Sequence, residues 1–186
     1  YGRRWIMKNL PGCDARVAFN ADPPERSLQM QQILAKAGIP YMFISRYREG
    51  LYRWLSPDGT GILVYTPGHY SKHISFLNNS LENSFRLINT EMTEQSPYYQ
   101  KRQIPPVRCL INTTDFAQPT DFSPLIAAWN AQAGAHPAMG YGSMRGFFET
   151  INNPDAHFDT IAGERPDVWV YITGPTHHWT ASVKRE

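Results

Sequence analysis

The chain has 186 residues, of which 41% are apolar and 18% are charged, and its net charge is +2. This composition is typical of one globular domain with a sizeable core and excludes a disordered chain. The basic residues are scattered, which gives no case for a nucleic-acid partner, and no apolar run approaches the roughly 20 residues that span a membrane. We expect residues 1–186 to be a single, incomplete domain cut from a longer protein, because Tyr1 is not an initiator Met.

The first 45 residues have the pattern of a strand, a helix and a second strand. Residues 16–20 (RVAFN) are a short, partly apolar run, and residues 22–25 (DPPE) favour the start of a helix. Gly38 favours its end, and residues 39–45 (IPYMFIS) predict the next strand. The apolar residues on the core-facing side of this helix are Met30, Ile33, Leu34 and Ala37. Such a unit indicates parallel strand pairing.

A hairpin and a long helix are predicted next. Residues 51–55 and 61–65 read as paired strands, and residues 56–59 (SPDG) supply the turn. Apolar residues between 74 and 92 then recur at intervals of three and four, which predicts an amphipathic helix. We expect it to end near residues 96–97 (SP).

The second half continues the alternation of strands and helices. Residues 107–112 (VRCLIN) predict a third core strand, and residues 167–172 (DVWVYI) predict a last one. Helices are expected from Ser123 to near Gly134 and from about Ser143 through Ile151. The sequence therefore predicts one α/β domain.

Candidate functional residues follow the predicted strands. In barrels and open α/β sheets, functional groups gather beyond the carboxyl ends of strands. Asp22, Arg46, the segment 66–70 and Asp115 all lie at such positions. Two carboxylates converging from different strands are what glycoside cleavage needs, one to attack the anomeric carbon and one to protonate the leaving oxygen.

Each candidate also has a structural interpretation. Asp22 could be a helix N-cap, a contact worth about 1 kcal/mol, and Arg46 could be solvated at a strand exit. Asp115 could cap the turn before the next helix. His69 and Tyr70, our candidate substrate-binding residues, could lie in a plain loop. Spacing alone leaves these alternatives open.

Two further features suggest carbohydrate without establishing it. Aromatic residues make up 13% of the chain, and aromatic rings stack on sugars but also fill ordinary cores. His177 and His178 are adjacent, so on a strand they would point to opposite faces and rarely chelate one ion. A structural or sugar-contacting role is favoured over zinc ligation for this pair.

Residues 18–30 (AFNADPPERSLQM) and 34–46 (LAKAGIPYMFISR) resemble the nucleophile region of glycoside hydrolase family 38, the retaining α-mannosidases. In that family a strand ends in Asp, a Phe-Gly or similar turn and a helix follow, and a Gly-Ile-x-Tyr strand ends in Arg. In this chain Pro23-Pro24 replaces Phe-Gly, which suggests a divergent branch.

Other segments are similar to the same family. Residues 51–54 (LYRW) with Asp58-Gly59 look like its aromatic hairpin. Residues 110–116 (LINTTDF) resemble the strand that ends in Asp-Asp-Phe, with only the second acid, Asp115, present. Residues 142–148 (GSMRGFF) resemble a Gly-Thr-Leu-x-x-Tyr-Phe helix start, and residues 179–185 are loosely similar to a Trp-x-Gly-Tyr-x-Thr-Ser-Arg segment.

The resemblance implies a fold and a mechanism. The chain would be part of a seven-stranded (β/α) barrel, with mostly parallel strands and a hairpin insertion. Asp22 would be both the nucleophile and a zinc ligand, Arg46 would support its carboxylate, and Asp115 would be the acid/base. The substrate would be an oligosaccharide or glycan. Zinc would help as a Lewis acid.

The resemblance also implies that the chain is incomplete. The family's His-x-Asp zinc pair lies upstream of this segment and its last zinc His lies downstream. Since zinc normally needs three or four protein ligands, Asp22 alone should bind it poorly. We therefore expect the remaining parts of the parent chain to complete the barrel, and the isolated segment to be inactive.

Two other functions stay open at this point. One is a metal-dependent carbohydrate deacetylase on a related barrel, in which the carboxylate holds a metal and activates water. The other is a non-catalytic carbohydrate-binding remnant, favoured by the missing first acid before Asp115 and by Pro23-Pro24.

Overall fold

The structure, a computed structural model, describes residues 1–23, 27–115, 118–134 and 136–164. The strand expected at residues 167–172, the pair His177 and His178, and the segment 179–185 lie outside the described residues.

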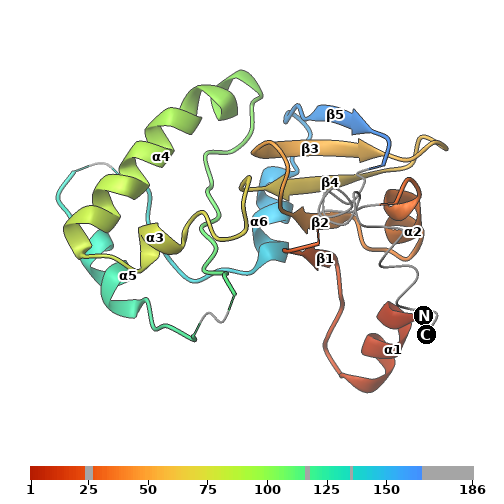
Figure 1. Ribbon diagram of the computed structural model, residues 1–186, viewed down its shortest axis with the longest axis horizontal. Coiled ribbons are helices and arrows are strands. Elements are labelled where there is room, and N and C mark those ends of the chain that lie inside the picture. The colour runs from red at the N-terminus through yellow and green to blue at the C-terminus, as the bar shows by residue number, and fades with distance from the viewer. Residues whose placement is uncertain (24–26, 116–117, 135, 165–186) are drawn as a thin grey trace, which may run out of the picture.

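A five-stranded mixed sheet forms the centre of the fold, in the order β1-β2-β4-β3-β5 (Figure 1). Its strands are β1 Val17–Asn20, β2 Tyr41–Ile44, β3 Gly50–Leu55, β4 Gly61–Thr66 and β5 Asp159–Ala162. The β1–β2, β2–β4 and β3–β5 pairs are parallel, and only the hairpin pair β3–β4 is antiparallel within the described part of the chain. An α/β fold with mostly parallel strands and a hairpin is therefore confirmed, while the seven-stranded barrel stays an expectation.

The predicted hairpin turn forms as its sequence indicates. The amide of Gly59 donates to the carbonyl of Ser56 at 2.9 Å, and Gly59 has a φ of +79°. A positive φ favours glycine because it has no Cβ. The amide of Thr60 donates to the Asp58 carboxylate at 3.0 Å, which closes the turn.

The sheet separates two apolar cores because alternate residues of a strand face opposite sides. Tyr41 and Phe43 of β2 belong to one core, whereas Met42 and Ile44 belong to the other. The first core is closed by residues of α6, with Tyr41 stacked on Phe148 at 4.9 Å between ring centroids. The second core is covered by apolar residues of α2: Met30, Leu34 and Ala35.

The helices are α1 Gly2–Asn9, α2 Met30–Lys36, α3 Ile74–Leu77, α4 Leu81–Lys101, α5 Ser123–Asn130 and α6 Met144–Ile151. Figure 1 shows α3, α4 and α5 gathered on one side of the molecule, away from α1 and α2. None of the described helices is long and apolar enough to cross a membrane.

Several predicted boundaries were wrong. The helix expected to start at residues 22–25 begins at Met30 with Gln29 as its N-cap, so Asp22 does not cap it. Ile33, expected on the core face, is 56% exposed. A helix of only seven residues buries a narrow stripe, and Leu34 rather than Ile33 contributes to it.

The expected long helix is divided into α3 and α4, and it does not end at Pro97. Ser80 caps α4 by accepting a hydrogen bond from the Asn83 amide at 3.4 Å, which starts a new helix. α4 continues through Pro97 to Lys101, although proline removes a helical hydrogen bond. Tertiary contacts explain this, since Tyr99 in the last turn is buried in the first core and the Tyr98 hydroxyl donates to the Leu51 carbonyl at 3.1 Å.

Residues 107–112, predicted as a third core strand, pair with no strand in the part of the chain that the structure describes. β5, which was not predicted, pairs with β3. Within this run only Ile111 is buried and Val107 is exposed, while the Arg108 guanidinium lies over the Tyr99 ring of α4 at 3.5 Å from its centroid.

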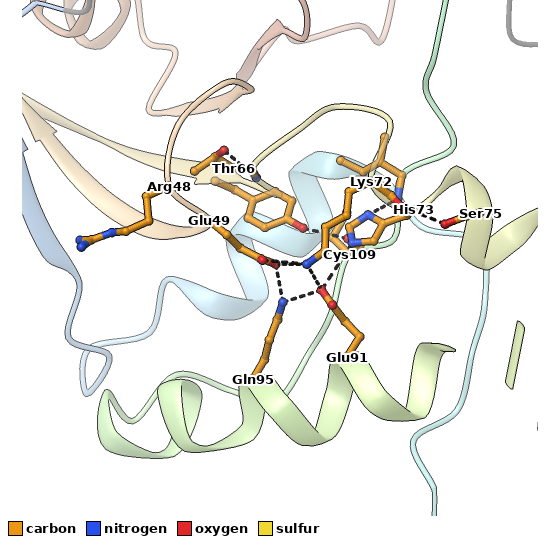
Figure 2. A network of polar contacts seen from close by, with 12 residues as sticks. Arg48, Glu49, Thr66, Lys72, His73, Ser75, Glu91, Gln95 and Cys109 are labelled. Atoms are coloured by element: carbon orange, nitrogen blue, oxygen red, sulfur yellow. Dashed lines mark hydrogen bonds and ion pairs between the residues drawn. The ribbon is translucent and has the colours of Figure 1, made fainter. Parts of the chain in front are cut away.

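A cluster of polar side chains fastens α4 to the sheet and to the segment after β4. We call it the Lys72 cluster, and Figure 2 shows it: Glu49, Lys72, His73, Glu91 and Gln95. The ammonium of Lys72 binds both oxygens of Glu49 at 2.7 Å and Oε1 of Glu91 at 2.7 Å. The amide of Gln95 donates to both carboxylates. Since Glu91 is only 7% exposed, this buried charge depends on its cationic partner.

We expect Ile151→Ala to lower the free energy of unfolding by about 2–5 kcal/mol, because Ile151 is fully buried in the first core. The matched control is Ile33→Ala, the same substitution on an exposed helical position, which should change stability by no more than about 0.5 kcal/mol. Urea denaturation curves of the two variants give both values. Equal losses would contradict the placement of Ile33 on the exposed face.

Acid should destabilise the protein through Glu91. Burial opposes its ionisation, but His73 and Lys72 together lower the pKa of Glu91 from 4.5 to about 2. A depressed pKa stabilises the fold above the unfolded value, so this contribution is lost as the pH falls from about 4.5 to about 2. The pKa of Glu49 moves in the opposite direction. Burial raises it and Glu91 raises it further, although Lys72 lowers it.

Unfolding curves at several pH values between 5 and 2 test this contribution. Glu91→Gln should be less stable than wild type at neutral pH and should lose less of its remaining stability on acidification. Glu94→Gln, at an exposed position of the same helix, should keep the wild-type acid dependence. An unchanged acid dependence in Glu91→Gln would count against the ionised, paired state of this carboxylate.

Candidate active site

The candidate residues lie beyond the carboxyl ends of three neighbouring strands. Asp22 follows β1, Arg46 follows β2, and His69 and Tyr70 follow β4. Since β1, β2 and β4 are adjacent and parallel, these ends meet at the same edge of the sheet. Asp115 comes to this edge from the segment that was expected to be a strand.

Arg46 binds Asp22 through two contacts. Nη2 of Arg46 lies 2.6 Å from Oδ1 of Asp22, and Nε donates to the Asp22 backbone carbonyl at 2.9 Å. The two side chains are 27% and 42% exposed, so the ion pair is open to the solvent on one side. Arg46 therefore pairs with a carboxylate and is not simply solvated at the strand exit.

The backbone of Arg46 adopts an unusual conformation. Its φ is +58°, in the left-handed region that costs a non-glycine residue about 1–2 kcal/mol. The amide of Arg46 donates to the Gly68 carbonyl at 2.7 Å, which ties the end of β2 to the loop after β4. Strained residues persist where surrounding contacts hold them, often at functional sites.

Tyr70 links this ion pair to the second carboxylate. Its hydroxyl donates to Oδ1 of Asp115 at 3.2 Å, and the Arg46 guanidinium lies over its ring at 5.5 Å from the centroid. The Tyr70 amide donates to the Ser45 hydroxyl at 2.9 Å, and the His69 ring stacks on the Tyr70 ring. Burial and the neighbouring Asp115 carboxylate raise the pKa of Tyr70, so it stays a hydrogen-bond donor at neutral pH.

The structure thus brings all five sequence-predicted residues together: Asp22, Arg46, His69, Tyr70 and Asp115. Asp115 does not close the turn before α5, where Asp121 accepts a hydrogen bond from the Ser123 amide at 2.9 Å; the N-cap of α5 is Phe122, without a side-chain cap bond. His69 lies at the exposed margin and contacts the Ser71 hydroxyl at 2.8 Å.

Ser45 was missed by the sequence reasoning, although its hydroxyl positions Tyr70. A serine at a strand end carries no distinctive signal, because such residues are common in any turn. Only its position immediately before Arg46 could have indicated that Ser45 belongs to the site.

The described residues do not form a metal site by themselves. No group of three or more His, Cys, Asp or Glu side chains that could hold a metal ion lies within residues 1–23, 27–115, 118–134 and 136–164. Asp22 could supply one ligand. Because structural and catalytic zinc sites use three or four protein ligands, this donor set does not hold zinc alone.

Comparisons with known proteins identify one family and one solved structure of similar fold. The sequence profile of the glycosyl hydrolases family 38 N-terminal domain matches residues 1–173. The crystal structure of an alpha-mannosidase from Enterococcus faecalis V583 superposes with a TM-score of 0.68 and 15% sequence identity, covering 88% of this chain and 19% of that chain. No curated protein matches. The chain therefore spans about a fifth of the length of that mannosidase.

The profile covers nearly the whole sequence, and the structural likeness agrees on the fold. The chain belongs to glycosyl hydrolase family 38, as a segment of its N-terminal domain.

Proposed function

We propose that the intact protein carrying this chain hydrolyses α-mannosidic bonds of glycans with retention of configuration. Membership of the family supports glycoside hydrolysis. The observation that carries the proposal is the connected set of contacts from Asp22 through Arg46 and Tyr70 to Asp115. A retaining glycosidase needs two carboxylates about 5–5.5 Å apart, one as nucleophile and one as acid/base.

Asp22 fits the nucleophile. Arg46 binds its Oδ1 at 2.6 Å, which fixes the orientation of the carboxylate and leaves Oδ2 to attack the anomeric carbon. In the proposal Oδ2 attacks, and the bond to the leaving oxygen breaks as the covalent glycosyl-enzyme forms. Water later hydrolyses this ester and releases the sugar.

Asp115 fits the acid/base. It is exposed, so a leaving oxygen can reach it, and its Oδ1 accepts the Tyr70 hydroxyl at 3.2 Å. In the proposal Oδ2 carries the proton to the leaving oxygen and later removes a proton from the attacking water. Tyr70 fixes the carboxylate orientation through Oδ1, and the exposed His69 ring, stacked on the buried Tyr70 ring, is the aromatic surface that a sugar could contact.

Zinc would enter this site only with ligands from outside the chain. A Lewis acid would bind mannose hydroxyls and favour distortion toward the oxocarbenium-like transition state. Asp22 is the ligand that this chain would contribute. We also propose that the single incomplete domain seen here needs the rest of the parent protein to complete a barrel, and that the isolated segment is inactive.

The first test uses the intact protein with zinc on an aryl α-mannoside. Asp22→Ala should lower kcat/KM by several orders of magnitude, because no covalent intermediate can form. Asp115→Ala should lose less on a substrate with a good aryl leaving group than on one with a poor leaving group, since only the latter needs protonation. Asp155→Ala, an exposed acid on the loop after α6, is the control and should keep wild-type turnover.

The same experiment discriminates the alternatives. A glycosyl-enzyme trapped on Asp22 excludes a carbohydrate deacetylase, which forms no covalent intermediate. An inert wild-type protein with zinc present would overturn the mannosidase proposal for this substrate class and favour a carbohydrate-binding remnant.

Removing the Tyr70 hydroxyl tests its contact with Asp115. Tyr70→Phe should lower kcat by about 10- to 100-fold, because a hydrogen bond to a charged group is worth about 1.5–3 kcal/mol. The matched control is Tyr141→Phe, since the Tyr141 hydroxyl donates to Asp121 at 3.1 Å away from the site. A comparable loss in both variants would show that the effect is general and not specific to Asp115.

A further inference from the structure

The segment 107–115, which carries Asp115, is held by side chains and not by a strand ladder. These side chains come from β4 and from the stretch between β4 and α4. The Tyr65 hydroxyl donates to the Cys109 carbonyl at 3.1 Å, and the backbone amide of Ile111 donates to His73 Nδ1 at 3.2 Å. The side-chain amide of Asn78 donates to Asn112 Oδ1 at 3.0 Å, and the Tyr70 hydroxyl donates to Asp115 Oδ1 at 3.2 Å. The position of Asp115 therefore depends on these contacts.

Among these contacts, the one made by His73 is the most deeply buried. His73 is 1% exposed and Ile111 is 9% exposed. A buried backbone N–H needs an acceptor, because water cannot replace the lost partner. The His73 ring also packs edge-on against Phe76 at 5.4 Å between centroids.

The same contact determines which nitrogen of His73 carries the proton. Nδ1 accepts the Ile111 N–H, so Nδ1 is unprotonated and Nε2 carries the hydrogen. Nε2 faces Oε1 of Glu91 at 3.6 Å. Lys72 and Gln95 in turn hold that carboxylate, as Figure 2 shows. Glu91, itself bound by Lys72 and Gln95, thus holds the imidazole in the tautomer and orientation that the Ile111 amide requires.

Sequence spacing places this contact close to the reacting group. His73 lies three residues after Tyr70, and Ile111 lies four residues before Asp115. Two of the contacts between the segments therefore lie within a few residues of each other, the one between His73 and Ile111 and the one between Tyr70 and Asp115. Moving the Ile111 end would move the carboxylate relative to the tyrosine.

We propose that His73 is a positioning residue for the reaction, which accepts the Ile111 amide and so holds Asp115 in place against Tyr70 for proton transfer. This inference rests on the proposed function, since it takes Asp115 as the acid/base. His73 itself touches neither substrate nor the reacting atoms. A misplacement of about 1 Å can cost on the order of 100-fold in rate, so losing this anchor should lower kcat more than it changes KM.

Two conservative variants of the intact protein separate the anchor from simple packing. His73→Asn places an amide oxygen near the position of Nδ1 and can still accept the Ile111 N–H. His73→Gln places its amide near the position of Nε2, so it can still face Glu91 but leaves Ile111 without its acceptor. Both variants lose the imidazole ring, so packing loss is common to them.

We expect kcat on the aryl α-mannoside to fall by about tenfold or more in His73→Gln, with KM changed by less than about threefold. His73→Asn should keep kcat within about threefold of wild type. Hydrogen exchange at the Ile111 amide should be faster in His73→Gln than in His73→Asn, while exchange at the Ile88 amide in α4 stays slow in both. Wild-type kcat in His73→Gln, or equal losses in both variants, would overturn the proposal.

The exchange measurement keeps this inference separable from the proposed function. A wild-type protein that is inert with zinc present would overturn the mannosidase activity. Exchange at Ile111 needs no turnover, and unchanged exchange in His73→Gln would overturn the anchor whether or not the protein is a mannosidase.

Discussion

The parallel pairing of β1, β2 and β4 is the constraint on which the site depends. Parallel neighbours end at the same edge, so Asp22, Arg46 and Tyr70 meet although 24 residues separate the first two. The pairing register sets this meeting point, with Asn20 opposite Ile44 at the ends of β1 and β2. A shift of one residue would send these side chains to the opposite face. The two apolar cores hold that register because each face of the sheet buries its own set of side chains.

The positions of the strand ends could be predicted from the sequence, but the partners of the side chains there could not. The strands predicted at residues 16–20 and 39–45 correspond closely to β1 and β2, and the turn predicted at residues 56–59 joins β3 to β4. Asp22 was compatible with a helix cap and with an ion pair, because both use the same carboxylate oxygen. The ion pair with Arg46 depends on the β1–β2 pairing and on the positive φ of Arg46, and neither can be predicted from the local sequence.

Local patterns failed where tertiary contacts decided the outcome. The apolar run at residues 107–112 predicted a strand, yet side chains such as Tyr65 and His73 satisfy its backbone instead. Pro97 predicted a helix end, yet the buried ring of Tyr99 stabilises one more turn of α4. In both places the prediction was wrong because period and propensity do not identify contacts with residues distant in the chain.

The two carboxylates of the candidate site have different partners, as the roles proposed for them require. Asp22 is bound by the Arg46 guanidinium, whose charge is permanent and whose planar group holds Oδ1 in place. Asp115 accepts a hydrogen bond from the Tyr70 hydroxyl on Oδ1, and Oδ2 is the oxygen to which the proposal assigns proton transfer. In many hydrolases the surroundings of two similar groups decide which is the acid and which the nucleophile, and the proposal assigns Asp22 and Asp115 on that basis. The Arg46 guanidinium lies over the Tyr70 ring, and the Tyr70 hydroxyl binds Asp115. One side chain therefore fixes the position of the Asp22–Arg46 ion pair relative to the Asp115 carboxylate.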